Sequence, residues 1–169
     1  ILAATAQALP EAIERDGLQL HMAGRVETVR LAASTEIAAV RDADLVLFCV
    51  KSNDTEAVAG AMAPLLAEGA LVLSLQNGVA NPQTIARHGR AGQAVVPTVV
   101  YVATAMPGPG VVQHFGRGDL VVGPLTDADA ADAAQGARLQ ALVAFMATAG
   151  VPVRVSPTVM DELWAKLMV

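Results

Sequence analysis

The chain has little cysteine, few basic residues and no long apolar run, and each shortage excludes a class of protein. Cys49 is the only cysteine among 169 residues, which excludes an internal disulfide and a thiolate metal cage and suits an intracellular setting. The 11 Lys and Arg residues are scattered among 16 Asp and Glu, so we expect no nucleic-acid partner. Although 54% of the residues are hydrophobic, no apolar stretch approaches the ~20 residues of a membrane span. We therefore expect a soluble, cytoplasmic protein with no membrane partner.

A glycine-rich phosphate-binding turn is also absent. A sheet that holds a dinucleotide normally opens with glycines in G-x-G-x-x-G spacing, because only glycines let the backbone approach the pyrophosphate at a helix N-terminus. None of the 14 glycines has that spacing. Two interpretations stay open: the chain binds no dinucleotide, or the first strand and its turn lie before Ile1. Nothing that follows Ile1 has the pattern of a signal peptide.

Two apolar runs, at residues 45–50 and 70–75, end abruptly in polar groups. Lys51 follows the first run, and Gln76-Asn77-Gly78 follows the second. Aliphatic runs of this length with helical sequence between them are typical of parallel strands buried on both faces. In open α/β sheets, ligands bind in the crevice beyond the carboxyl ends of such strands. We therefore expect Lys51 and Asn77 to face the same small volume.

The remaining patterns extend this α/β interpretation. They predict helices at residues 9–16, 35–40, 54–68 and 127–149, a helix capped by Asn81 and begun by Pro82, and a last helix capped by Ser156-Pro157. They predict strands at residues 18–22, 25–31, 94–103, 111–115, 120–122 and 151–155, with turns at 106–110 and 116–118. The fold expected is a mostly parallel α/β sheet with an antiparallel extension.

Four segments, in this order, resemble the ketopantoate reductase (2-dehydropantoate 2-reductase) family. They are Val50-Lys51, Leu-Gln-Asn-Gly at 75–78, Pro-Gly-Val-Val-Gln-His at 109–114 with Gly-Arg-Gly at 116–118, and Glu-Leu-Trp-Ala-Lys-Leu at 162–167. The resemblance implies a Rossmann-like NADP-binding domain at residues 1–155 and the start of an all-helical domain at 156–169. It implies NADPH-dependent reduction of 2-dehydropantoate, or of a similar 2-keto acid, to the 2-hydroxy acid of the pantothenate and coenzyme A pathway.

The resemblance also assigns roles to individual residues. Lys166 matches the catalytic lysine, which would protonate the ketone oxygen as hydride arrives from the nicotinamide. Asn77 matches the asparagine that contacts both cofactor and substrate, and its amide would hold the two in a reactive geometry. Lys51, Gly78 and, more weakly, Ala105 match cofactor-binding positions. No metal is implied.

Each of these residues also has an ordinary structural interpretation. Lys166 lies four residues after Glu162, a spacing at which a solvated ion pair on a helix is common. Asn77-Gly78 could form a type I′ hairpin turn, although the helix start at residues 81–82 argues against it. Lys51 could simply leave a strand into water. The alternative function is therefore a non-catalytic module that binds a nucleotide or an acidic metabolite.

The same resemblance leads to expectations about completeness and assembly. The family's first strand, which is central in the Rossmann order, has no counterpart here, so more chain or a second chain should fill the gap. The 169 residues alone are expected to be inactive, because the pyrophosphate cradle and much of the substrate wall lie outside them. The expected partner is a small 2-keto acid, and a homodimer stays open. Cys49 is expected to be a small core residue.

Overall fold

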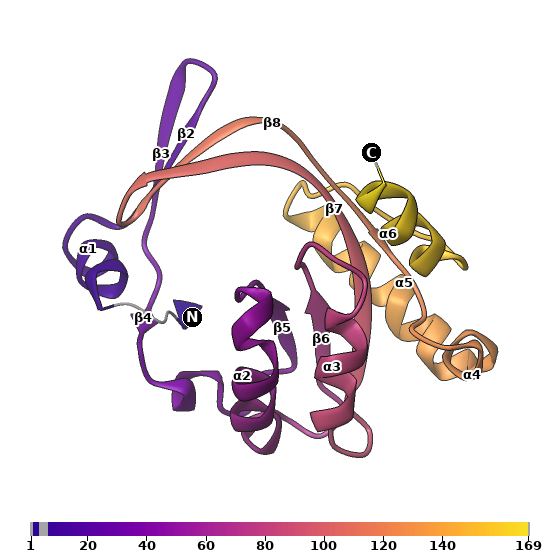
Figure 1. The fold of residues 1–169 in the computed structure, drawn as a ribbon. Helices are drawn as coiled ribbons and strands as arrows, with labels where there is room; N and C mark the ends of the chain where they lie inside the picture. The colour runs from indigo at the N-terminus through magenta and orange to yellow at the C-terminus, as the bar shows by residue number, and fades with distance from the viewer. Residues whose placement is uncertain (1, 4–6, 169) are drawn as a thin grey trace. The chain divides into compact units, whose positions relative to one another are not determined.

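The chain folds into two compact units that the long strands β7 (Ala94–Gly108) and β8 (Val111–Val122) both pass through. The structure is a computed structural model and describes residues 2–3 and 7–168 (Figure 1). The sheet unit comprises Asp42–Tyr101 and Gly118–Val169, and the hairpin unit comprises Ile1–Arg41 and Val102–Arg117.

The sheet unit is built on parallel strands. β5 (Leu45–Phe48) pairs with β6 (Leu71–Ser74), and β6 pairs with the first part of β7, both in parallel. β8 follows β7 in the strand order, and β9 (Val153–Val155) lies parallel to β8. The prediction of a mostly parallel, Rossmann-like α/β sheet is confirmed.

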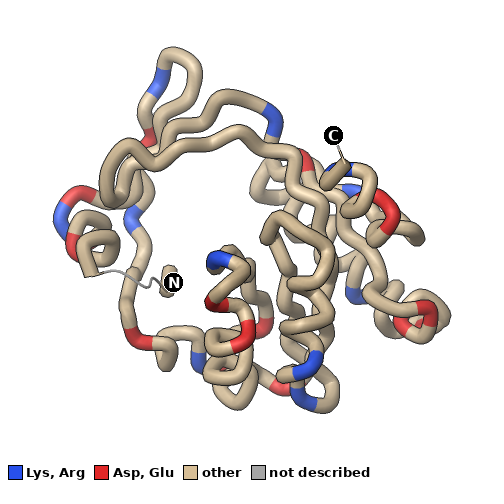
Figure 2. Tube along the Cα trace, in the orientation of Figure 1, with Lys and Arg blue, Asp and Glu red and all other residues tan. Residues whose placement is uncertain are grey.

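Helices alternate with these strands in the sheet unit. They are η2 (Ser52–Asp54), α2 (Thr55–Met62), η3 (Ala63–Leu65), α3 (Asn81–His88), α4 (Asp127–Ala131), α5 (Ala133–Thr148) and α6 (Val159–Leu167). Across the part of the chain that the structure describes, no helix is long and apolar enough to cross a membrane. Acidic and basic positions are interspersed along the trace (Figure 2).

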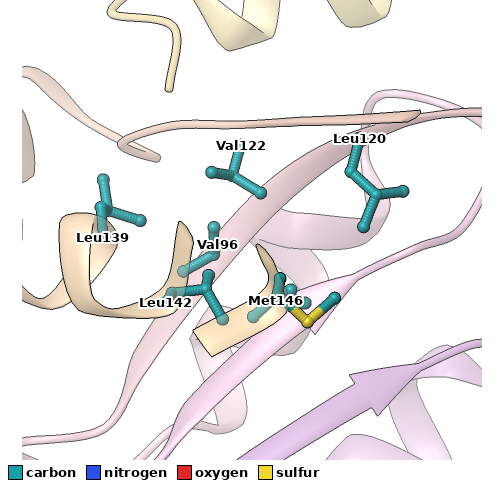
Figure 3. Close-up of a cluster of buried hydrophobic side chains, with 7 residues drawn as sticks. Val96, Leu120, Val122, Leu139, Leu142 and Met146 are labelled. Atoms are coloured by element: carbon teal, nitrogen blue, oxygen red, sulfur yellow. The ribbon is translucent and has the colours of Figure 1, made fainter. Parts of the chain in front are cut away.

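Two apolar clusters form on the two faces of the sheet, because successive residues of a strand point to opposite sides. Leu120 and Val122 of β8 join the cluster that packs against α5, whereas Val121 between them joins the cluster that packs against α6. The α5 cluster consists of Leu73, Val96, Leu120, Val122, Leu139, Leu142 and Met146 (Figure 3). We call the cluster of Val99, Val121, Val159 and Leu163 the α6 cluster.

The hairpin unit contains the helix predicted at residues 9–16 and the two strands predicted to follow it, which form a hairpin. α1 (Ala8–Asp16) ends at Gly17, whose φ of 79° is accessible to glycine at little cost. β2 (Leu18–Met22) and β3 (Arg25–Val29) pair antiparallel, and β2 also pairs in parallel with the start of β8. The unit also holds β1 (Leu2–Ala3), its parallel partner β4 (Ala33–Ser34) and the 3-10 turn η1 (Ile37–Val40).

The prediction of three short strands between residues 94 and 122 was wrong. The structure has two long strands, β7 and β8, with Pro109-Gly110 as the only residues between them. Gly116, Arg117 and Gly118 all have positive φ, yet they lie within β8 rather than in a turn. Glycine in a strand allows a local kink without ending the ladder, so a glycine-rich segment did not mark a strand end here.

Two helices that were predicted to be continuous are interrupted. The helix expected at 54–68 ends at Met62, and Pro64, which has no N–H to donate, lies in the 3-10 turn η3. The helix expected at 127–149 breaks at Asp132, whose side chain accepts a 2.8 Å hydrogen bond from the Ala134 amide and so caps α5. The segment predicted as one helix therefore contains two, each with its own N-terminal cap.

β5 is less buried than its apolar sequence predicts. Leu47 is 50% exposed, whereas Leu73 at the equivalent place in β6 is fully buried. The reason is position, because β5 has β6 on one side and is the last strand in the order of this sheet among the residues that are described. Cys49, which follows β5, is also exposed, so the prediction of a core cysteine was wrong, although partial desolvation raises the pKa of its thiol.

Candidate functional site

Lys166 and Asn77 meet in the sheet unit. The Lys166 Nζ donates a 2.9 Å hydrogen bond to the Asn77 Oδ1, although 89 residues separate the two in the sequence. Asn77 lies in the loop after β6, and Lys166 lies in the last turn of α6. The structure therefore brings together an ammonium group and a carboxamide that were predicted to share one site.

The packing of α6 explains why Lys166 points toward the sheet. Val159 and Leu163 are 0% and 5% exposed, and both belong to the α6 cluster. Lys166 lies three residues after Leu163 and seven after Val159, and these spacings place side chains on the same face of a helix. The apolar anchors therefore fix the face on which the ammonium group lies.

The ordinary interpretation of Lys166, an ion pair with Glu162, does not hold in the structure. The Arg154 Nη2 donates to the Glu162 Oε2 at 2.5 Å, and the Arg154 Nη1 donates to the Oε1 at 3.1 Å. Hydrogen bonds from Arg154 and, secondarily, from Ser156 lower the pKa of the Glu162 carboxyl. Ser156, which was predicted to cap α6, also accepts a bond from the Thr158 amide at 3.2 Å, one residue before the helix begins.

A buried amide ties the ends of the neighbouring strands together. The Gln76 Nε2 donates to the Val50 carbonyl oxygen at 2.8 Å and to the Thr55 Oγ1 at 2.7 Å. The Ser74 Oγ donates to the Gln76 Oε1 at 3.3 Å. Gln76, Thr55 and Ser74 are all buried, so these bonds lie out of water and hold the end of β5, the end of β6 and the start of α2 in one arrangement.

A second buried amide extends this network to the two loops that carry the predicted site residues. The Asn81 Nδ2 donates to the Asn77 carbonyl oxygen at 2.8 Å and to the Ser52 Oγ at 3.0 Å. The Asn81 Oδ1 accepts a 3.3 Å bond from the Thr55 Oγ1. Since Ser52 directly follows Lys51, one side chain fixes both loops. We call Thr55, Ser74, Gln76 and Asn81 the polar network.

The network was not predicted from the sequence, and one assignment was wrong. α3 begins at Asn81 with Ala80 in the N-cap position, so Asn81 is not the cap of this helix. Its amide bonds to the loops instead. The available signal was Gln76, a polar residue placed directly after a buried strand, but its burial depends on tertiary contacts with Val50 and Thr55.

The remaining predicted site residues are Lys51, Gly78 and Ala105. Lys51 is exposed and precedes η2 as its N-cap, and Gly78 follows Asn77 with a φ of 93°. Because β6 is parallel to both of its neighbours, Asn77-Gly78 is not a hairpin turn. Ala105 is exposed in β7 and belongs to the hairpin unit.

The chemistry of this site suits an anionic organic ligand. Lys166 supplies an ammonium group and Asn77 supplies an amide with both donor and acceptor atoms, which fits phosphate, carboxylate and carboxamide groups. Within the described ranges, no group of three or more His, Cys, Asp or Glu residues could hold a metal ion. A hollow lined by Glu68, Arg90, Ala91 and Gln93 lies at the opposite, amino ends of β6 and β7.

The parallel strands, the alternating helices and the polar groups at the carboxyl ends of the strands define a Rossmann-like α/β protein. A family model described as Ketopantoate reductase PanE/ApbA matches residues 2–127. The chain therefore belongs to the ketopantoate reductase family.

Individual relatives agree with this assignment. A 2-dehydropantoate 2-reductase of Halobacterium salinarum is 34% identical over 158 residues, which are 93% of this chain and 50% of the relative. The crystal structure of a PanE/ApbA family ketopantoate reductase from Ralstonia eutropha is 48% identical, with a TM-score of 0.82 over 96% of this chain and 50% of that one. A 2-dehydropantoate 2-reductase structure from Porphyromonas gingivalis, 20% identical, shares the fold with a TM-score of 0.78, covering 98% of this chain and 56% of that one. The chain thus spans about half the length of these relatives.

Proposed function

We propose that the complete protein reduces 2-dehydropantoate, or a similar 2-keto acid, to the 2-hydroxy acid with NADPH. The observation that carries the proposal is the 2.9 Å contact between the Lys166 ammonium and the Asn77 carboxamide. Membership in the ketopantoate reductase family supports the reaction class. The curated relative from Halobacterium salinarum supports the substrate, because its name is 2-dehydropantoate 2-reductase.

Lys166 would act as the proton donor in this reaction. Reduction of a ketone requires hydride at the carbonyl carbon and a proton at the carbonyl oxygen, and the hydride is the chemistry that a bound dihydronicotinamide supplies. The Lys166 ammonium carries the proton, and its hydrogen bond to Asn77 holds it in place. The Asn77 amide would bond either to Lys166 or to the ligand groups that it orients.

Lys51 and Gly78 would contribute to cofactor binding. Lys51 presents a positive charge at the end of β5, where a phosphate or carboxylate gains from it, and Asn81 ties its loop to that of Asn77. Gly78 has a positive φ beside Asn77, so a side chain at this position would be strained. We also propose that the protein prefers NADP to NAD and that the Ala105 backbone contacts this cofactor. The proposed location of the protein is the cytoplasm.

Two further parts of the proposal concern the extent of the active protein. We expect a boundary at residues 155 and 156 between the cofactor-binding domain and a helical domain. We also expect no turnover by the 169-residue chain alone, since it spans about half of the relatives' length. An NADPH oxidation assay of the chain beside the complete protein tests this second expectation.

The central test is a substitution of Lys166 in the complete protein. We expect Lys166→Ala to lower kcat for ketopantoate reduction by about 10²- to 10⁴-fold, the usual contribution of a general acid. Lys166→Arg keeps the charge but not the ability to release a proton, so it should be nearly as impaired. Arg87→Ala, which removes an exposed cation from α3, is the matched control. Unchanged turnover in Lys166→Ala would contradict the assigned role.

The same assay separates the proposal from a non-catalytic alternative. A module that only binds a nucleotide or an acidic metabolite through Lys51 and Asn77 would bind NADPH without oxidising it in the presence of any 2-keto acid. Calorimetric binding of NADPH by the complete protein, together with no turnover, would favour that alternative.

A further inference from the structure

Glu162 lies on α6 where its carboxylate could pair with the Lys166 ammonium and so compete with Asn77. Glu162 precedes Lys166 by four residues, and this order and spacing favour an ion pair on a helix. A carboxylate next to an ammonium group favours the charged form, so such a pair would make Lys166 a poorer proton donor. It would also draw the ammonium along the helix and away from Asn77. A competent site therefore requires that Glu162 be held elsewhere.

Arg154 on β9 occupies both oxygens of this carboxylate. Its two terminal nitrogens bond to the two Glu162 oxygens at 2.5 and 3.1 Å, which is the paired geometry of a guanidinium fork on a carboxylate. Two parallel bonds fix the direction of the carboxylate, whereas a single bond would let it swing. The Glu162 side chain is 25% exposed, so its orientation is also restricted by its neighbours.

Several groups near Arg154 favour its charged form. Glu162 on α6, Tyr101 on β7 and Asp119 on β8 all raise the pKa of the Arg154 guanidinium, with the bond to Glu162 as the largest cause. Lys166 is left with the neutral Asn77 amide as its partner. The arginine therefore bonds to the carboxylate, and the lysine bonds to the amide.

We propose that Arg154 is a positioning residue that holds the Glu162 carboxylate away from Lys166 and so leaves the ammonium to Asn77. The inference deepens the proposed function and rests on it, since it concerns the delivery of the proton by Lys166. Arg154 does not touch the reacting groups, and its effect passes entirely through Glu162.

A double substitution tests this role in the complete protein. In Arg154→Leu, Glu162 loses its guanidinium partner and keeps only the weaker bond from Ser156, so it can turn to Lys166. We expect kcat to fall about tenfold, with KM less affected, as for one misplaced charge-assisted bond. The basic limb of the pH profile of kcat should move to higher pH. In Arg154→Leu combined with Glu162→Gln, the competing charge is gone, so most of the lost kcat and the original pH profile should return.

Two single variants serve as controls. Glu162→Gln alone can still accept from Arg154 and should stay close to the parent protein. Arg154→Lys keeps the charge but not the fork, and should fall between the parent and Arg154→Leu. If the double variant is as impaired as Arg154→Leu, with an unshifted pH profile, Arg154 acts only on the local fold and the proposal is overturned.

A crystal structure of Arg154→Leu separates this proposal from the proposed reaction. If the parent protein reduces no 2-keto acid, the reductase proposal fails, but the position of Glu162 still decides the role of Arg154. The expected result is a Glu162 carboxylate bonded to Lys166, whose hydrogen bond to Asn77 is then broken. A retained hydrogen bond between Lys166 and Asn77, with Glu162 turned to solvent, would overturn the role of Arg154 whatever the reaction.

Discussion

The two sides of the Lys166 and Asn77 contact are held by different forces. Lys166 lies on α6, which the apolar α6 cluster and a close approach to Gly123 attach to the sheet. Asn77 lies in a loop that the buried polar network attaches to the ends of β5 and β6. One partner is thus positioned by contacts that have no preferred direction, and the other by hydrogen bonds with defined donors and acceptors.

This difference shows which contacts stabilise the sheet unit and which fix the positions of Lys166 and Asn77. Apolar burial supplies most of the free energy of folding, whereas a buried hydrogen bond adds little net stability but fixes geometry. The network is fully satisfied, since no buried side-chain nitrogen or oxygen among the residues that the structure describes lacks a partner. We therefore expect changes in the α6 cluster to act mainly on stability, and changes in the network to act mainly on turnover.

The largest expected loss of stability comes from truncating the α6 cluster. Leu163→Ala removes a buried side chain and leaves a cavity, so the free energy of unfolding should fall by about 2–5 kcal/mol. Trp164→Ala, on the exposed side of the same helix, should change it by less than about 0.5 kcal/mol. Urea unfolding of both variants measures the difference, and equal losses would mean that α6 is not anchored by this cluster.

A substitution of Gly123 tests the contact between α6 and the sheet by adding a side-chain atom where there is no room for one. A Cβ added at Gly123 would overlap the Ser156 carbonyl oxygen and lie 2.8 Å from the Val159 side chain. Gly123→Ala should therefore destabilise the protein by about 1–3 kcal/mol. Gly136→Ala in α5 meets no atom within 4 Å and should instead stabilise it by about 0.4–1 kcal/mol. Thermal unfolding distinguishes the two, and a harmless Gly123→Ala would show that α6 can move off the sheet.

Removal of the Gln76 amide should lower turnover more, and stability less, than truncation of the α6 cluster. Gln76→Leu leaves the Val50 carbonyl and the Thr55 hydroxyl without their donor, at a cost of about 1–3 kcal/mol. We expect kcat of the complete protein to fall about tenfold, more than for Leu163→Ala at a temperature where both are folded, because Asn77 loses its fixed position. Gln83→Leu, on the exposed side of α3, is the control. If Leu163→Ala loses more kcat than Gln76→Leu, the division of roles is refuted.

The smallest effect expected is a dependence of stability on pH at Glu162. The pKa of Glu162 is lowered in the folded protein from its ordinary value of 4.5, chiefly by Arg154. A lowered pKa in the folded state means that the stabilisation is present above pH 4.5 and is lost as the pH falls through the folded pKa. The difference in unfolding free energy between the parent and Glu162→Gln should therefore be seen at neutral pH and vanish in acid. A difference that grows in acid would contradict the assigned ion pair.

Several parts of the fold could be predicted because they depend on short-range patterns. The alternating polarity at residues 18–29, with Gly24 at the turn, predicts the β2 and β3 hairpin, and Gly17 marks the end of α1. The aliphatic runs before Lys51 and before Gln76 predict parallel strands that end at one edge. Asn77 followed from its place after a buried aliphatic run, whereas Lys166 followed from the motif resemblance and not from composition or spacing.

Other features could not be predicted, because the same residues have different effects in different surroundings. Gly116 and Gly118 kink a strand that continues, whereas Gly17 ends a helix, and only the neighbouring chain decides between these outcomes. Leu47 reads like a core residue, but its exposure depends on how many strands lie beside β5.

The sequence by itself determined the alternation of strands and helices around the two aliphatic runs, the polar residues at the ends of those strands and the family, since these depend on local propensity and motif. Only tertiary structure decided that Glu162 pairs with Arg154 and that the Gln76 amide is buried, and it brought Lys166 to Asn77 as the family resemblance had implied. The physical reason is that a helix offers Lys166 a carboxylate four residues away at little entropic cost. Only the packing of α6 against the sheet, which brings β9 and the β6 loop within reach, provides the better partners.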